Sequence, residues 1–136
     1  MTPPLTPALA LDYLRELSAD VRGGAVLDAA GAGLAGEPGL IGPAAAFVAA
    51  MGAAAEAETR TPRGAVFAAR APELALVLVC GPRALSALTR HDLGIVLGDL
   101  GAGRPAGAGT SAPAPVSPPA ALADRLISAA QRGPGT

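Results

Sequence analysis

Residues 26–39 read VLDAAGAGLAGEPG, a short apolar segment followed at once by a run of glycines. Within it, Gly31, Gly33 and Gly36 satisfy G-x-G-x-x-G, the spacing found in loops that bind dinucleotides. Such loops follow a β-strand, and the apolar segment is typical of one. The stretch therefore either binds a nucleotide such as NAD or only turns the chain.

The residues after the glycines favour a turn. In a dinucleotide fold the helix begins inside the glycine run, because its N-terminal N–H groups hold the pyrophosphate. Here Glu37-Pro38-Gly39 stops a helix, and the acidic residue expected about 20 positions on would be Glu56, inside a predicted helix. We therefore predict a β-hairpin with strands at Gly24–Asp28 and Leu34-Ala35 and its turn at 28–33. A nucleotide-binding enzyme is kept as a distant alternative.

Length and composition narrow the function classes. The chain has 136 residues, a formal net charge of −1 and 2% aromatic residues, which suggests one domain with extensions. Nucleic-acid binding is not expected, because it needs phosphate-neutralising charge or aromatic stacking platforms. Cys80 is the only cysteine, so neither an intramolecular disulfide nor a cysteine-based zinc site can form. The N-terminus lacks the layout of a signal peptide, and a cytoplasmic location is the default expectation.

Hydrophobic periodicity and helix signals predict the order of the elements. Thr6-Pro7 resembles an N-cap followed by proline, and apolar residues then recur at helical spacing. After the hairpin the sequence predicts a long alanine-rich helix, three strands, and a short helix capped by Asp92. The expected bounds are a helix at Pro7–Ala19, a helix at Leu40–Glu58, strands at Arg63–Arg70, Leu74–Cys80 and Arg83–Thr89, and a helix over residues 93–100.

The long helix is apolar on two sides. Ala45, Ala49, Gly52 and Ala53 form a second face of small residues, opposite the one that can pack on a sheet. The uncharged run over residues 38–55 has nearly the length of a membrane span, but alanine and glycine contribute little to insertion. We predict a buried helix with two partners, because such a face left exposed would be an unusual apolar patch.

Residues with catalytic potential have simpler interpretations. Cys80, His91 and Asp92 can be imagined as a Cys–His–Asp set, but Cys80 ends the most apolar strand and is expected to be an inert, buried thiol. One histidine and scattered carboxylates offer no metal-ligand spacing. We therefore expect no catalytic, cofactor-binding or metal-binding residue.

Three arginines surround the first of the three predicted strands. Arg60, Arg63 and Arg70 leave an anion site open, but charges beside a strand more often protect an exposed edge from aggregation. The strand Arg63–Arg70 is accordingly the one we place at the edge of the sheet.

The composition changes after residue 100. Residues 101–119 are rich in Gly, Ala, Pro, Ser and Thr, which predicts a linker. The amphipathic helix after it is too short to be stable alone and is expected to dock on another surface. The predicted organisation is a disordered N-terminus at 1–6, a domain at 7–100, a linker at 101–119, a helix at 120–132 and a disordered end at 133–136.

This order of elements resembles the Roadblock/LC7 family, bacterial or actinobacterial type. The resemblance covers roughly Leu9 to Leu100. Its most family-like pieces are the hairpin, with Asp28 and Gly31 followed by Leu34-Ala35, and Asp92-Leu93-Gly94. The matching stretches are LRELSADVRGGAVLDAAGAGLAG, LIGPAAAFVAAMGAAAEAE and RGAVFAARAPELALVLVCGPRALSALTRHDLGIVLGDL.

The resemblance implies an α+β fold, with a five-stranded antiparallel sheet and helices on one face. It also implies a non-catalytic protein that dimerises, with itself or a paralogue, by pairing third strands at the sheet edge and packing second helices together. The residues this places at the dimer interface are Ala45, Ala49, Gly52, Ala53, Val66 and Phe67. The function it implies is a cytoplasmic adaptor that modulates a small Ras-like GTPase or a signalling complex, with no membrane span and no nucleic acid.

A small-ligand-sensing module of a signalling system is the alternative. It requires a cavity between the sheet and its helices, and the scarcity of aromatic residues leaves a loosely packed core open.

Overall fold

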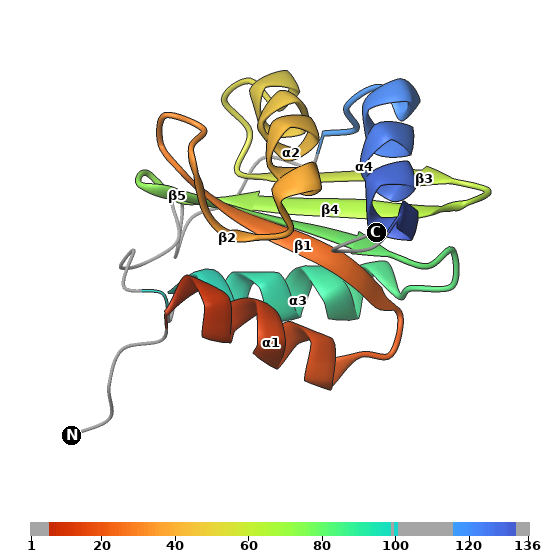
Figure 1. The fold of residues 1–136 in the computed structure, drawn as a ribbon, viewed down its shortest axis with the longest axis horizontal. Helices are drawn as coiled ribbons and strands as arrows, with labels where there is room; N and C mark the ends of the chain where they lie inside the picture. Colours follow the sequence, from red (N-terminus) through yellow and green to blue (C-terminus); the bar gives the residue numbers. More distant parts are fainter. Residues whose placement is uncertain (1–5, 99, 101–115, 133–136) are drawn as a thin grey trace.

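The computed structural model describes residues 6–98, 100 and 116–132. The predictions of disorder at 1–5 and 133–136, and of a linker at 101–115, lie outside the described residues. Figure 1 shows a central sheet between two layers of helices.

The sheet is antiparallel throughout, and its strand order is β2-β1-β5-β4-β3. The α+β class with a five-stranded antiparallel sheet is therefore confirmed. The strands are β1 (Val21–Asp28), β2 (Gly33–Gly36), β3 (Glu56–Thr61), β4 (Gly64–Arg70) and β5 (Leu74–Cys80).

Helices cover both faces of the sheet, which corrects the expectation that they lie on one face. The pair α1 and α3 covers one face, and the pair α2 and α4 covers the other (Figure 1). The reason lies in β5, whose apolar run sends Val77 into the core under α2 and Leu78 into the core under α1, so each face needs its own cover. The helices are α1 (Pro7–Leu17), α2 (Pro38–Ala50), α3 (Ser86–Leu97) and α4 (Ala120–Arg132).

The first helix and the hairpin form as their local signals predict. Thr6 Oγ1 accepts a hydrogen bond from Leu9 N at 3.2 Å and caps α1. Asp28 Oδ1 accepts from the backbone N–H groups of residues 30 and 32, each at 2.9 Å, and shapes the turn between β1 and β2. Gly31 has φ +88° and Gly36 has φ +116°, conformations that favour glycine. The glycine run thus turns the chain, and α2 begins only at Pro38.

The long helix ends at Ala50, so the prediction that it continues to Glu58 is wrong. Gly52, with φ +61°, ends the helical path, and β3 follows. Alanine and glutamate favour a helix here, but tertiary packing overrides them. Ala57 and Thr59 are buried on the side of the sheet that α4 covers, while Glu58 and Arg60 face the other side.

The predicted strand Arg83–Thr89 is also wrong, because this stretch contains the start of α3. Leu93, Val96 and Leu97 are buried at helical spacing against the sheet. Asp92 consequently lies inside the helix and does not cap it; the N-cap residue is Leu85, whose side chain cannot accept a hydrogen bond.

The prediction for the sheet edge changes with β3. Most of the stretch Arg63–Arg70 is β4, and β4 lies between β5 and β3. It is an interior strand, because β3 pairs along its full length and displaces it from the edge. The two edges of the sheet are β2 and β3.

Candidate interaction surface

The outer side of β3 is paired with the C-terminal segment, by which we mean residues 116–132. Glu58 N donates to Val116 O at 2.9 Å, and Val116 N donates to Glu56 O at 3.1 Å, so the segment runs parallel to β3. Ser117 Oγ then donates to Glu58 O at 2.8 Å. Thr59 Oγ1 donates to the carbonyl of residue 118 at 2.7 Å. The main chain at the edge of β3 therefore binds an extended segment.

The segment continues into α4, which lies beside α2 over the β3–β4 side of the sheet (Figure 1). Ala123, Leu126 and Ile127 are at most 1% exposed and share one core with α2 residues Leu40 and Phe47. The helix expected to need a docking surface thus packs on its own sheet. The surface that it uses accepts an extended stretch followed by an amphipathic helix.

Three polar side chains of α4 contact one arginine. Arg63 lies next to the turn between β3 and β4, and its Nη2 donates to Ser128 Oγ and Gln131 Oε1, both at 3.0 Å. Its Nη1 lies 3.7 Å from Asp124 Oδ1. Because these groups are solvent-exposed, such an ion pair contributes only about 0–1 kcal/mol, and the apolar face of α4 supplies most of the docking energy.

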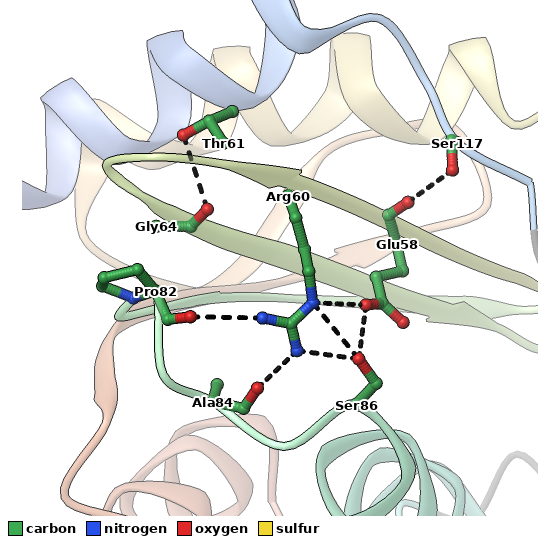
Figure 2. Close-up of polar contacts among 8 residues, drawn as sticks. All are labelled: Glu58, Arg60, Thr61, Gly64, Pro82, Ala84, Ser86 and Ser117. Carbon is green, nitrogen blue, oxygen red and sulfur yellow. Dashed lines mark hydrogen bonds and ion pairs between the residues drawn. The ribbon is translucent and has the colours of Figure 1, made fainter.

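On the opposite side of β3, Arg60 ties the strand to the loop before α3 (Figure 2). It donates to Glu58 Oε2 at 2.9 Å, to Ser86 Oγ at 2.7 Å, to Pro82 O at 3.3 Å and to Ala84 O. These bonds fix the start of α3, which has no side-chain cap of its own. With its donors used in this way, Arg60 has a structural role and does not form the anion site that the sequence left open.

Comparison with solved structures finds the same architecture in a Roadblock/LC7 domain from Streptomyces avermitilis. The match has a TM-score of 0.55 and 18% identity and covers 65% of this chain and 91% of that one. The chain has the Roadblock/LC7 fold. A second structure of a Roadblock/LC7 domain from Streptomyces avermitilis matches with a TM-score of 0.59 and 11% identity, over 68% of this chain and 92% of that one. No family model matches the sequence, and a search of curated proteins gives no match.

Within this Roadblock/LC7 fold, the small residues predicted for a dimer interface lie on the outer side of α2 and in the loop after it. Ala45 is half-buried, whereas Ala49, Gly52 and Ala53 are exposed. Their role in dimerisation stays a prediction.

Val66 and Phe67, the other two predicted interface residues, lie in the interior of the chain. Both are 0% exposed. Val66 belongs to the core under α2 and α4, and Phe67 to the core under α1 and α3. Their side chains are thus packed within the chain, because β4 is an interior strand.

A cavity of about 520 Å³ opens between the hairpin turn, the end of α2 and the β4–β5 turn. Its walls are mostly apolar, with Leu27, Val48, Ala49 and Leu74 among them, and Arg70 is its basic residue. Arg70 Nη2 donates to Ala54 O at 2.9 Å, and also to Gly52 O, which holds the guanidinium at the wall. The volume lies within the range of small-molecule sites, about 300–1,000 Å³.

The Cys–His–Asp combination is not assembled. Cys80 is 1% exposed at the end of β5, and burial, followed by the charge of Asp20, raises the pKa of its thiol to about 12. His91 is exposed on α3. A neutral thiol in an apolar core is a poor nucleophile.

Among residues 6–98, 100 and 116–132, no three His, Cys, Asp or Glu side chains cluster so as to hold a metal ion. No helix there combines the length and apolarity that crossing a bilayer requires.

The sequence analysis did not identify the residues that join β3 to the C-terminal segment, namely Val116, Ser117 and Thr59. Two signals for them exist. In β3, glutamates alternate with Ala57 and Thr59, the period of a half-buried strand. In the predicted linker, Val116 is the only branched apolar residue. Neither signal stands out beside the strong helix propensity and low complexity around it.

Proposed function

We propose that this chain is a non-catalytic interaction module that acts by binding other protein chains. The observation that carries the proposal is the pairing of β3: its edge binds an extended segment through the main chain, and the sheet beside it binds a helix. Edge strands are templates for strand addition, and this is a general mode of protein recognition.

The partner we propose is a second copy of this chain or a paralogue. Ala49 on the outer side of α2 and Gly52 and Ala53 in the loop after it are exposed, and residues this small let another helix approach closely. The loop after α2 leads into β3, so the two elements that we propose for the contact are consecutive in the chain. Through such a dimer the chain modulates a small Ras-like GTPase or a signalling complex.

The test is self-association of the full chain, measured by sedimentation velocity across a concentration series. Ala49→Arg places a charge on the proposed helix contact and is expected to weaken association at least tenfold without loss of helical circular dichroism. Ala8→Arg, an exposed position on α1, is the matched control and leaves association unchanged. A melting temperature raised saturably by NAD or GTP, with no association, contradicts the proposal and favours a nucleotide binder.

The cavity beside α2 supports a second candidate function, the sensing of a small ligand. The cavity walls are apolar apart from the Arg70 guanidinium and Asp28, whose Oδ1 already accepts two turn N–H groups, so Arg70 is the group that would hold a small amphipathic carboxylate. Octanoate is then expected to raise the melting temperature saturably, and 1-octanol, which lacks the anion, to raise it less. Equal shifts with both compounds, or none with either, argue against a site built around Arg70.

A further inference from the structure

We propose that the C-terminal segment is an internal competitor for the surface on which a second copy pairs. This inference rests on the proposed function and deepens it: the segment keeps the β3 edge closed within one chain, and its release opens that edge.

The segment uses the groups that a second chain would need. Val116 takes the outward N–H of Glu58 and the outward C=O of Glu56. Ser117 Oγ donates to the outward carbonyl of Glu58. A strand cannot be added at these positions while the segment is bound, because each N–H donates one hydrogen.

The pairing of the segment is also short, which makes it displaceable. Among the described residues, which begin again at Val116, the ladder consists of a single bridge, Ala57 with Val116. Pro118 and Pro119 follow and have no N–H to donate, so the ladder cannot extend along β3. A full-length strand on this edge would form more main-chain hydrogen bonds than the segment does.

The chemistry of β3 favours a second copy as that strand. In an antiparallel pair of two β3 strands centred on Thr59, each Glu58 lies opposite Arg60 of the other copy. The Glu58–Arg60 ion pair that exists within each chain would then face the same ion pair of the other copy, with opposite charges adjacent. Opposite charges on facing residues stabilise such a pair, and so do facing threonines at its centre. The edge is thus complementary to itself once the segment leaves.

The burial of the apolar face of α4 determines the fraction of chains in which the C-terminal segment is released from β3. Leu126 and Ile127 are fully buried against the sheet, and Ile127 lies over Gly64. Released copies are therefore a minority, and the apparent affinity between copies falls in proportion to that fraction. Any change that weakens the docking of α4 raises self-association.

Two variants of the full chain test this competition in opposite directions. The first is the double variant A57C/V116C, whose two positions are bridge partners on neighbouring strands, within reach of a disulfide. Oxidised, it locks the segment; reduced, the same sample is unlocked, and the buried Cys80 does not compete. The second variant, Ile127→Ala, favours release by about 30-fold or more, and Arg125→Ala, exposed on α4, is its matched control.

We expect sedimentation velocity to show dimers for reduced A57C/V116C and none, over the same concentration range, after oxidation. Ile127→Ala should dimerise at least tenfold more tightly than Arg125→Ala, with circular dichroism confirming that both are folded. Equal dimerisation of the oxidised and reduced forms overturns the competition and leaves the dimer itself standing. Absence of dimers in every form, Ile127→Ala included, overturns the proposed self-association as well.

Discussion

The two faces of the sheet are closed in different ways. On the face of α1 and α3, each helix adjoins in sequence a strand that it covers: α1 precedes β1, and α3 follows β5. On the other face, α2 covers only part of the sheet, and α4 arrives from the far end of the chain to cover the rest. The helices of the first face thus lie next to the sheet strands in the chain, whereas α4 is far in sequence from the strands β3 and β4 that it covers. The surface under α4 is accordingly the one at which we propose that a partner binds.

The exposed side chains of the helices also differ in size between the two faces. α1 and α3 carry large apolar residues even on their outer sides, such as Tyr13, Leu88 and Ile95. The outer side of α2 carries only small ones. A helix can approach small residues closely, which is why we propose α2 for helix packing between chains.

The largest expected effect tests whether the two faces unfold together. Phe47 on α2 and Phe67 on β4 are each 0% exposed, one in each core. Truncation of either to alanine leaves a cavity and should cost about 3–5 kcal/mol. Urea unfolding should show a single transition for both variants with the wild-type slope. A second transition in Phe47→Ala alone would mean that the face closed by α4 unfolds separately.

A chemical probe measures access to the face under α1 and α3. Burial raises the pKa of Cys80 from 9.0 to about 12, so at pH 8 its thiolate fraction is about a thousandfold below that of a free thiol. Iodoacetamide should label the native chain at least that much more slowly than the urea-unfolded chain. Rapid native labelling would show that this face opens as readily as the other.

The same thiol makes stability depend on pH in one direction. Its folded pKa lies above the unfolded value, so its contribution to stability is fully present below pH 9.0 and declines as pH rises toward 12. The reason is that the unfolded chain releases this proton first.

Elements with strong local signals could be predicted from the sequence. The cap and apolar spacing gave α1, glycines at a turn gave the hairpin, and the run LALVLVC gave β5. β3 could not be predicted with confidence, because Ala and Glu favour a helix locally and only pairing with β4 makes the stretch extended. The start of α3 at Ser86 was not predicted for a similar reason, since it is fixed by Arg60 of a distant strand.

The candidate surface was predictable only in part. The small residues on α2 are visible in the sequence, and so is the amphipathic character of residues 121–132. Their arrangement is not, because it depends on a parallel bridge between Ala57 and Val116, far apart in the chain. Such a contact has no local signature in either partner.

A smaller effect on the free energy of unfolding is expected from substituting two glycines that border α2, and it should differ between them. Gly36 has φ +116°, and a Cβ there would lie 2.4 Å from Gly24 O, whereas Gly52 has φ +61° and no atom within 4 Å of such a Cβ. Gly36→Ala should therefore cost about 3 kcal/mol, and Gly52→Ala only about 1 kcal/mol. Thermal and urea unfolding measure both. Equal costs would mean that the β1–β2 hairpin gives way around the added methyl group.

The smallest effect compares the two helices of the first face at their N-termini. Thr6 caps α1 with a side-chain hydrogen bond, whereas Leu85 at the start of α3 makes none. Thr6→Ala should cost about 1 kcal/mol, while Leu85→Ala, at a residue 68% exposed, should change stability by less than about 0.5 kcal/mol. Urea unfolding resolves the difference. A comparable loss in both variants would show that Leu85 holds α3 by a contact beyond capping, and that the Arg60 bonds alone do not set where that helix begins.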